Sequence, residues 1–326
     1  MLYEFALTVG LFDRFPPAVE AVANQSLVQV LHGLLRNGVL ASLYNGAWWA
    51  EVQKKRGTIH PRIQPLTMAL LTRLFDRGLV VPRTKEAATC PRNDAEWLDE
   101  AIASHGRQNL YGIIAKKASI DARAARPPCA IGIEDVLLAE FWNDRRQSRR
   151  VPRTTAGFEE ALAPVLGTAR SVTLIDPQIA FRVYRGNMEF LEMLSVVDRC
   201  ATPVNRRCPL SLVEIHTADA PEIASADYPR VIRAIQGAMP RICASAATRI
   251  FRAWQAKPNG PPFHNRRILT NQTAISCPWG LDVHERPGHA VGEDEWALMD
   301  DDVHGAIWRD FQQNTSPYDL QQDIPW

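Results

Sequence analysis

Residues 171–176 read SVTLID and are followed by Pro177, and this stretch indicates the fold class of the second half of the chain. Apolar and β-branched residues that end in an Asp-Pro turn pair are typical of a buried β-strand. A second such run, LSLVEIHT, occupies residues 210–217. Between the two runs, residues 188–200 carry apolar side chains at helical spacing. The order strand, helix, strand predicts a layered α/β structure.

The alternation of helices and strands continues on both sides of this unit. Residues 158–165 fit a helix, and residues 228–254 show one long helical pattern with a potential break at Pro240. Two short strands are predicted next, Arg267–Thr270 and Ala274–Ser276. The order β-α-β-α-β-β predicts a mixed sheet between helices.

The first half of the chain has a different, mostly helical pattern. Apolar residues recur at helical spacing in residues 19–35, 66–79 and 131–142. We therefore predict a mainly helical N-terminal domain in residues 1–155, which would dock to other proteins or bind nucleic acid. An α/β domain is predicted in residues 156–326.

Two segments fit more than one interpretation. The helix of residues 66–79 runs into LVVPR, residues 79–83, which fits a short strand of an α+β unit or of a DNA-binding winged helix. The five arginines in residues 145–153 fit a solvated hinge or a patch that contacts phosphate. Near the end, residues 303–311 are expected to form a helix that is followed by a loose end.

The composition narrows the class of protein. A chain of 326 residues with 46% apolar and 22% charged residues can fold into two domains. A net charge of +1 means that any basic surface must be local. The six cysteines form no Cys-x-x-Cys pair, which fits a reducing cytosol rather than a disulfide framework or a zinc site. With no signal-peptide pattern and no apolar run of about 20 residues, we expect a cytoplasmic protein that needs no metal or cofactor.

The stretch with the clearest functional pattern is FHNRRILTN, residues 263–271. On a strand, residues two apart share a face, so His264 and Arg266 would project together. A guanidinium offers a fork of donors to phosphate, and an imidazole can attack phosphorus or transfer a proton. Asn271 would stand at the end of the strand, where it can orient a partner side chain. The stretch therefore predicts a phosphate-binding strand.

This pattern resembles the motif of the phospholipase D-like superfamily. That motif has His-x-Lys, four residues, Asp and then a turn of small residues. This chain has His264-x-Arg266, four residues, Asn271 and then a turn that begins near Ser276. The resemblance covers residues 171–282, where the order of strands and helices also looks like one half of that fold. Single-motif His-x-Arg variants occur in the C-terminal domain of a family of MIT-domain membrane-binding proteins and in bacterial proteins that accompany antiviral systems.

The resemblance implies a set of site residues. The catalytic set is His264, Arg266 and Asn271, and the phosphate-binding set is Arg266, Arg267 and Ser276. Asp176, at the end of the first strand, would pair with Arg266 or orient His264, although an Asp-Pro turn is an equally good interpretation. Glu214 and His216 share a face of the second strand and would supply an acidic partner, while His216 also fits a purely structural role.

The departures from the motif leave three hypotheses. Arg266 and Asn271 replace Lys and Asp, and a single motif needs a homodimer to supply the two histidines of the standard enzyme. These changes favour a binding subunit of a bacterial antiviral assembly, which would hold nucleic acid or another phosphodiester beside other protein subunits. The alternative is a metal-independent phosphodiesterase or nuclease that works as a homodimer through a phosphohistidine at His264. The third hypothesis is a structural scaffold in which His264 is buried away from any cleft.

Overall fold

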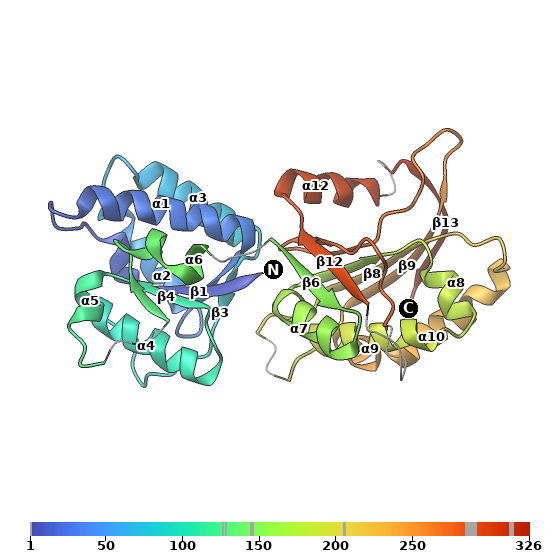
Figure 1. Ribbon diagram of the computed structural model, residues 1–326, viewed down its shortest axis with the longest axis horizontal. Helices are drawn as coiled ribbons and strands as arrows, with labels where there is room; N and C mark the ends of the chain where they lie inside the picture. The colour runs from blue at the N-terminus through green and yellow to red at the C-terminus, as the bar shows by residue number, and fades with distance from the viewer. Residues whose placement is uncertain are drawn as a thin grey trace. The chain divides into compact units, whose positions relative to one another are not determined.

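The computed structural model describes residues 2–125, 127, 129–143, 147–204, 207–283, 292–312 and 316–326, with only the backbone of Asp301. The chain divides into two compact units, an N-terminal unit of Leu2–Arg146 and a C-terminal unit of Gln147–Trp326 (Figure 1). The boundary falls before residue 155, where we expected it, because Ser148–Pro152 forms a strand of the second unit.

In the described part of the N-terminal unit, five strands form a sheet in which every neighbouring pair is parallel. Their order is β3-β2-β1-β4-β5. The strands are β1 (Tyr3–Leu7), β2 (Gly38–Ser42), β3 (Val80–Pro82), β4 (Gly112–Ala115) and β5 (Ala130–Gly132). Parallel sheets need helices on both faces, and this one has them.

The helices of the N-terminal unit cover the sheet from two sides. The pair α1 and α3 packs together on one face, and α4 and α5 lie on the other (Figure 1). The α-helices are α1 (Glu20–Asn37), α2 (Ala47–Lys54), α3 (Gln64–Asp76), α4 (Asp94–Arg107), α5 (Lys117–Asp121) and α6 (Glu140–Asn143); the 3-10 helices are Val9–Phe12, Lys55–Gly57 and Val136–Leu138. The helices predicted in residues 19–35 and 66–79 are confirmed as α1 and α3.

Two expectations for this unit are wrong, and one of two alternatives is excluded. The prediction of a mainly helical domain missed the parallel sheet. Its short strands are buried on both faces and therefore show no apolar–polar alternation in the sequence. The helix expected in residues 131–142 is instead the end of β5, a 3-10 turn and α6. The strand in residues 79–83 exists as β3, but it pairs in parallel with β2 and so does not form the wing of a winged helix.

In the described part of the C-terminal unit, eight strands form a mixed sheet of order β13-β9-β8-β7-β10-β11-β12-β6. Strands β7, β8 and β9 are mutually parallel, and all other neighbours are antiparallel. The strands are β6 (Ser148–Pro152), β7 (Ser171–Ile175), β8 (Leu212–Ala218), β9 (Thr248–Ala256), β10 (Arg267–Thr270), β11 (Ala274–Ser276), β12 (Glu293–Leu298) and β13 (Tyr318–Pro325). The predicted α/β class with a mixed sheet is confirmed.

Helices lie on both faces of the mixed sheet. One face carries α7 (Thr155–Leu166), α8 (Ile179–Tyr184), α9 (Met188–Ala201), α10 (Tyr228–Ala238) and α11 (Pro240–Ser245), with the 3-10 turn Ser225–Asp227. The other face is covered by α12 (Asp301–Asp310), which is drawn in red in Figure 1. Beneath α12 is a buried apolar cluster of Ile175, Trp254, Phe263, Leu269, Ala274, Ile307 and Phe311.

Several predicted elements of the C-terminal unit have the expected bounds, and three do not exist as expected. Strands β10 and β11 have the predicted bounds. The helical pattern of residues 228–254 is wrong beyond Pro240, because α11 begins at that proline and the chain then forms β9. The loose end after residue 311 is wrong, because β13 pairs with β9.

The basic run in residues 145–153 is the third exception. Residues 145 and 146 lie outside the described part of the chain, and residues 148–152 form β6 rather than a hinge. Arg149 and Arg150 pair with the acidic residues Glu160 and Glu293. No helix in the described ranges is both long and apolar enough to cross a lipid bilayer.

Candidate phosphate-binding site

The candidate site lies where β7 ends and β10 begins. Because β10 runs antiparallel to β7 and Arg267 pairs with Ile175, the residue before β10 meets the residue after β7. These two residues are Arg266 and Asp176. The parallel strands β7, β8 and β9 end at this same edge of the sheet. Open α/β sheets bind ligands beyond the carboxyl ends of their strands, so the edge is a suitable place for a site.

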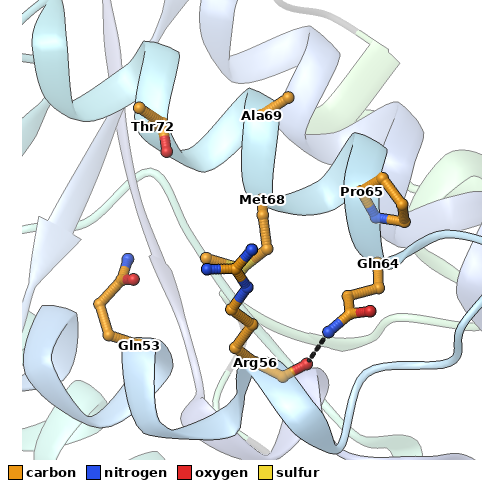
Figure 2. Close-up of a pocket in the computed structure, with 7 residues that line it drawn as sticks. All are labelled: Gln53, Arg56, Gln64, Pro65, Met68, Ala69 and Thr72. Atoms are coloured by element: carbon orange, nitrogen blue, oxygen red, sulfur yellow. Dashed lines mark hydrogen bonds between the residues drawn. The ribbon is translucent and has the colours of Figure 1, made fainter.

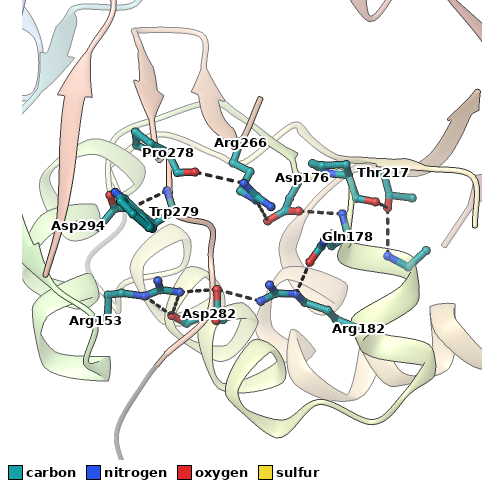
Figure 3. A network of polar contacts seen from close by, with 12 residues as sticks. Arg153, Asp176, Gln178, Arg182, Thr217, Arg266, Pro278, Trp279, Asp282 and Asp294 are labelled. Atoms are coloured by element: carbon teal, nitrogen blue, oxygen red, sulfur yellow. Dashed lines mark hydrogen bonds and ion pairs between the residues drawn. The ribbon is translucent and has the colours of Figure 1, made fainter. Parts of the chain in front are cut away.

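Arg266 and Asp176 form the centre of the site (Figure 3). Arg266 Nε lies 3.6 Å from Asp176 Oδ2, which is the pairing that the sequence suggested. Arg266 Nη1 donates to the carbonyl oxygen of Pro278 at 3.2 Å, and Asp176 Oδ1 accepts the backbone N–H of Gln178 at 2.8 Å. Burial raises the pKa of Asp176, against the lowering effects of the Gln178 N–H and the Arg266 charge.

Two further arginines extend the site. Arg153 Nη2 and Arg182 Nη1 lie 2.5 and 2.9 Å from the same oxygen, Oδ1 of Asp282. Arg182 Nε also donates to the side chain of Gln178 at 3.0 Å, which connects this group to Asp176. One carboxylate between two guanidinium groups leaves an excess positive charge. We call this set the arginine cluster: Arg153, Arg182, Arg266, Asp176 and Asp282.

The arginine cluster retains donors for a ligand. The side chains of Arg266 and Arg182 are 23% and 22% exposed. Their Nη2 groups make no hydrogen bond within the described part of the chain. A guanidinium that is fixed through some of its N–H groups and open through the others is well placed to bind an oxyanion.

His264 lies in the segment between β9 and β10. We expected a strand that includes His264 and Arg266, but β10 begins only at Arg267. The imidazole is exposed, which does not support the scaffold hypothesis with a buried His264. It forms no hydrogen bond or ion pair with the residues that the structure describes. An unengaged imidazole two positions from Arg266 is available for chemistry.

Asn271 does not belong to the arginine cluster. Its Oδ1 accepts the backbone N–H groups of Arg170 at 2.6 Å and Ser171 at 3.3 Å, at the beginning of β7. The whole of β10 separates it from Arg266, which corresponds to about 16 Å of extended chain. The structure therefore does not bring Asn271 together with Arg266; its side chain joins the end of β10 to the beginning of β7.

Arg267 and Ser276 are brought together, but on the other face of the sheet. They are cross-strand partners on β10 and β11, and they share the face of Leu269 and Ala274, which α12 covers. Arg266 contacts Asp176 instead. The predicted phosphate-binding set is therefore divided, and only Arg266 lies in the arginine cluster.

Glu214 and His216 belong to a separate polar group on β8 and β9. Glu214 Oε1 accepts a hydrogen bond from Arg252 Nη1 at 2.9 Å, and its Oε2 is 3.8 Å from His216 Nε2. His216 Nδ1 accepts the indole N–H of Trp254 at 3.0 Å, and burial lowers the pKa of His216. Both side chains are buried in a closed polar network, so the structural role considered for His216 extends to Glu214.

The sequence interpretation missed some members of the arginine cluster. Arg153 was part of the basic run, where one hypothesis assigned it a phosphate contact. Asp282 stood at the last position of the motif resemblance without an assigned role. Arg182 had no signal of its own, because its place depends on how the short helix α8 packs beside β8.

The N-terminal unit has a separate surface groove of about 420 Å³ between α2 and α3 (Figure 2). Its lining is mostly polar and consists of Gln53, Arg56, Gln64, Pro65, Met68, Ala69 and Thr72. None of the residues predicted from the phosphate motif lines it. Within the described ranges, no group of three or more His, Cys, Asp or Glu side chains could hold a metal ion.

No protein-family model matches the sequence, and no curated protein is similar to it. The function is therefore inferred from the site itself.

Proposed function

We propose that the C-terminal unit binds a phosphodiester of nucleic acid, or another phosphodiester, at the arginine cluster. In line with the motif resemblance, we propose a phospholipase D-like component of a bacterial antiviral assembly with other protein subunits. The observation that carries the binding proposal is the position of Arg266. Its guanidinium is held by Asp176 and Pro278 at the carboxyl edge of parallel strands, and its Nη2 stays open.

The charges of the cluster support reversible binding. Three guanidinium groups face the carboxylates of Asp176 and Asp282, which leaves one excess positive charge. Asp176 is fully buried, and its raised pKa shows that its ionised form is disfavoured there. A phosphate at Arg266 would compete with a carboxylate that burial already destabilises.

Replacing Arg266 by alanine should weaken binding to a fluorescein-labelled 20-nucleotide single strand. Loss of a hydrogen bond between charged groups costs about 1.5–3 kcal/mol, or roughly 10- to 150-fold in Kd. Fluorescence anisotropy at several salt concentrations would also show a salt slope smaller by about one. Arg150→Ala is the control. The Arg150 side chain is 82% exposed, and its replacement removes the same charge from the same unit.

Asp176→Asn provides a variant with the opposite expected effect. The amide oxygen can still accept the Gln178 N–H, but the negative charge beside Arg266 is gone, so affinity should increase. Equal losses for the Arg266 and Arg150 variants, or weaker binding by Asp176→Asn with an intact fold, would contradict phosphate binding at this site.

The alternative is a metal-independent phosphodiesterase, and the exposed, unengaged imidazole of His264 favours it. In a homodimer, one His264 would attack phosphorus, and the leaving oxygen would take a proton from His264 of the second protomer. Water would then cleave the phosphorus–nitrogen bond. Cleavage in EDTA should fall by about a thousandfold or more in His264→Gln, while anisotropy shows unchanged binding. A full cleavage rate in that variant would exclude this function.

A further inference from the structure

Trp279 is the exposed tryptophan of the turn that contacts Arg266. Its side chain is 70% exposed, whereas Trp254, Trp296 and Trp326 in the same unit are at most 7% exposed. Single exposed apolar side chains are common on protein surfaces. Exposure alone therefore assigns no role to Trp279, whereas the way in which its turn is held does.

The backbone at Trp279 is fixed by two hydrogen bonds, one from the candidate site and one to Asp294. Pro278, before it, accepts the hydrogen bond from Arg266 Nη1, and the N–H of Trp279 donates to Asp294 Oδ2 at 3.3 Å. Asp294 is 1% exposed and is held in turn by the indole N–H of Trp296 at 2.9 Å. The exposed indole therefore stands on an anchored backbone (Figure 3).

Gly280 completes this anchor. Its φ of +107° lies in the region that side chains rarely adopt, and its N–H donates to the carbonyl oxygen of Cys277 at 3.1 Å. Cys277 in turn donates its N–H to the carbonyl oxygen of Arg266 at 2.9 Å. The start of the turn is thus bonded to the backbone of Arg266, and its end is bonded to its start. A rigid aromatic side chain loses little conformational freedom when it binds a flat ligand.

We propose that Trp279 stacks on a nucleobase of a single strand whose phosphate is held by Arg266. This inference rests on the proposed function and names its substrate class. An aromatic face beside a cationic backbone contact is how proteins bind single strands without sequence preference, because every base has a π-face. In a duplex the bases are stacked on one another, and their faces are not open to an indole.

The test compares ligands that differ only in their bases. A 12-nucleotide oligo-dT and an abasic strand of the same length carry the same sugar–phosphate backbone. Trp279→Ala should weaken oligo-dT binding by about 5- to 100-fold and leave abasic binding unchanged. Trp279→Phe should retain most of the affinity. Met188→Ala is the matched control, since Met188 is 66% exposed in the same unit.

The two proposals fail in different ways. An equal loss of oligo-dT and abasic binding in Trp279→Ala would overturn stacking while leaving phosphate binding in place. A base-dependent effect of Trp279 without any effect of Arg266→Ala would support stacking and contradict the proposed function. Vesicles of phosphatidylcholine with phosphatidylserine serve as the lipid arm. Trp279-dependent binding to vesicles, with none to oligo-dT, would overturn the nucleic-acid proposal in favour of a lipid surface.

Discussion

Replacing Arg83 by alanine should lower the unfolding free energy of the N-terminal unit by about 3–5 kcal/mol. The Arg83 side chain is 2% exposed, and it binds both carboxylate oxygens of Glu4 on β1 at 2.9 Å. Its Nη1 donates to the carbonyl oxygens of Ser104 at 3.1 Å and Gln108 at 2.6 Å, where α4 ends. One guanidinium thus joins β1 to the last turn of α4. Its loss leaves a half-buried carboxylate and these carbonyls without that donor.

Hydrogen exchange measured by mass spectrometry suits this test, because it reports the stability of each unit separately. The slowest amides of β1 and α4 should exchange faster in Arg83→Ala, and those of the C-terminal unit should not change. Arg107→Ala is the control in the same unit; that side chain is 65% exposed beside Glu86, so we expect about 1 kcal/mol or less. Arg83→Lys should restore only part of the loss, because an ammonium cannot form the fork. Similar losses for Arg83→Ala and Arg107→Ala would contradict this account.

The sequence was most informative in the centre of the C-terminal unit. The strands β7, β10 and β11 are runs of β-branched and apolar residues between turn residues, which is why their bounds were predictable. The contact of Asp176 with Arg266 was one of the two roles considered for a carboxylate at the end of a strand. These features depend on local sequence and on the general position of sites at strand ends.

Strands β9 and β13 could not be predicted from the local sequence, because pairing with strands far away in the sequence stabilises them. The sequence of β9, TRIFRAWQA, contains two arginines and follows a helical pattern, so it fits the end of a helix. Its arginines are stabilised by partners from other elements: Arg249 binds the carbonyl oxygens of Cys243 and Ala246, and Arg252 binds Glu214. In β13, an edge strand, half-buried and exposed residues alternate regularly, but none is fully buried and the half-buried positions include the polar Gln322, so the apolar–polar signal in the sequence is weak.

In the candidate site, too, the sequence does not show which distant residues become partners. Arg266 and Arg267 are adjacent, so on an extended chain they face opposite sides of the sheet, and only one can join a given pocket. Asn271 is five positions after Arg266 and therefore reaches the far edge of the sheet. The sequence spacing alone did not show which elements would supply the partners of Arg266. That information comes from the antiparallel register of β10 with β7.

Glu214 requires the sharpest test, because the sequence assigned it to the site and the structure places it in a closed network. Arg252→Met should lower the unfolding free energy of the C-terminal unit by about 3–5 kcal/mol, since it leaves the Glu214 carboxylate, 6% exposed, without its guanidinium. In the double variant Glu214→Gln with Arg252→Met, both charges are absent and the stability should largely return. Because the double variant should be much more stable than Arg252→Met alone, the four proteins should give a coupling free energy at or above the upper end of the usual range of about 0.5–3 kcal/mol.

The pH dependence gives an independent check. Burial alone would raise the pKa of Glu214, but contacts with His216 and the charge of Arg252 hold it below its ordinary value of 4.5. The ionised carboxylate therefore contributes stability above pH 4.5, and this contribution is lost as the pH falls through the lowered pKa. Without the Arg252 charge one of the causes that lower the pKa of Glu214 is lost, so this pKa should rise, and protonation should relieve the variant at a higher pH than it affects the unmodified protein. The stability difference between Arg252→Met and the unmodified protein, measured by hydrogen exchange corrected for pH, should shrink between pH 7 and pH 5. A difference that stays constant over this range would show that Glu214 is not the group left unpaired.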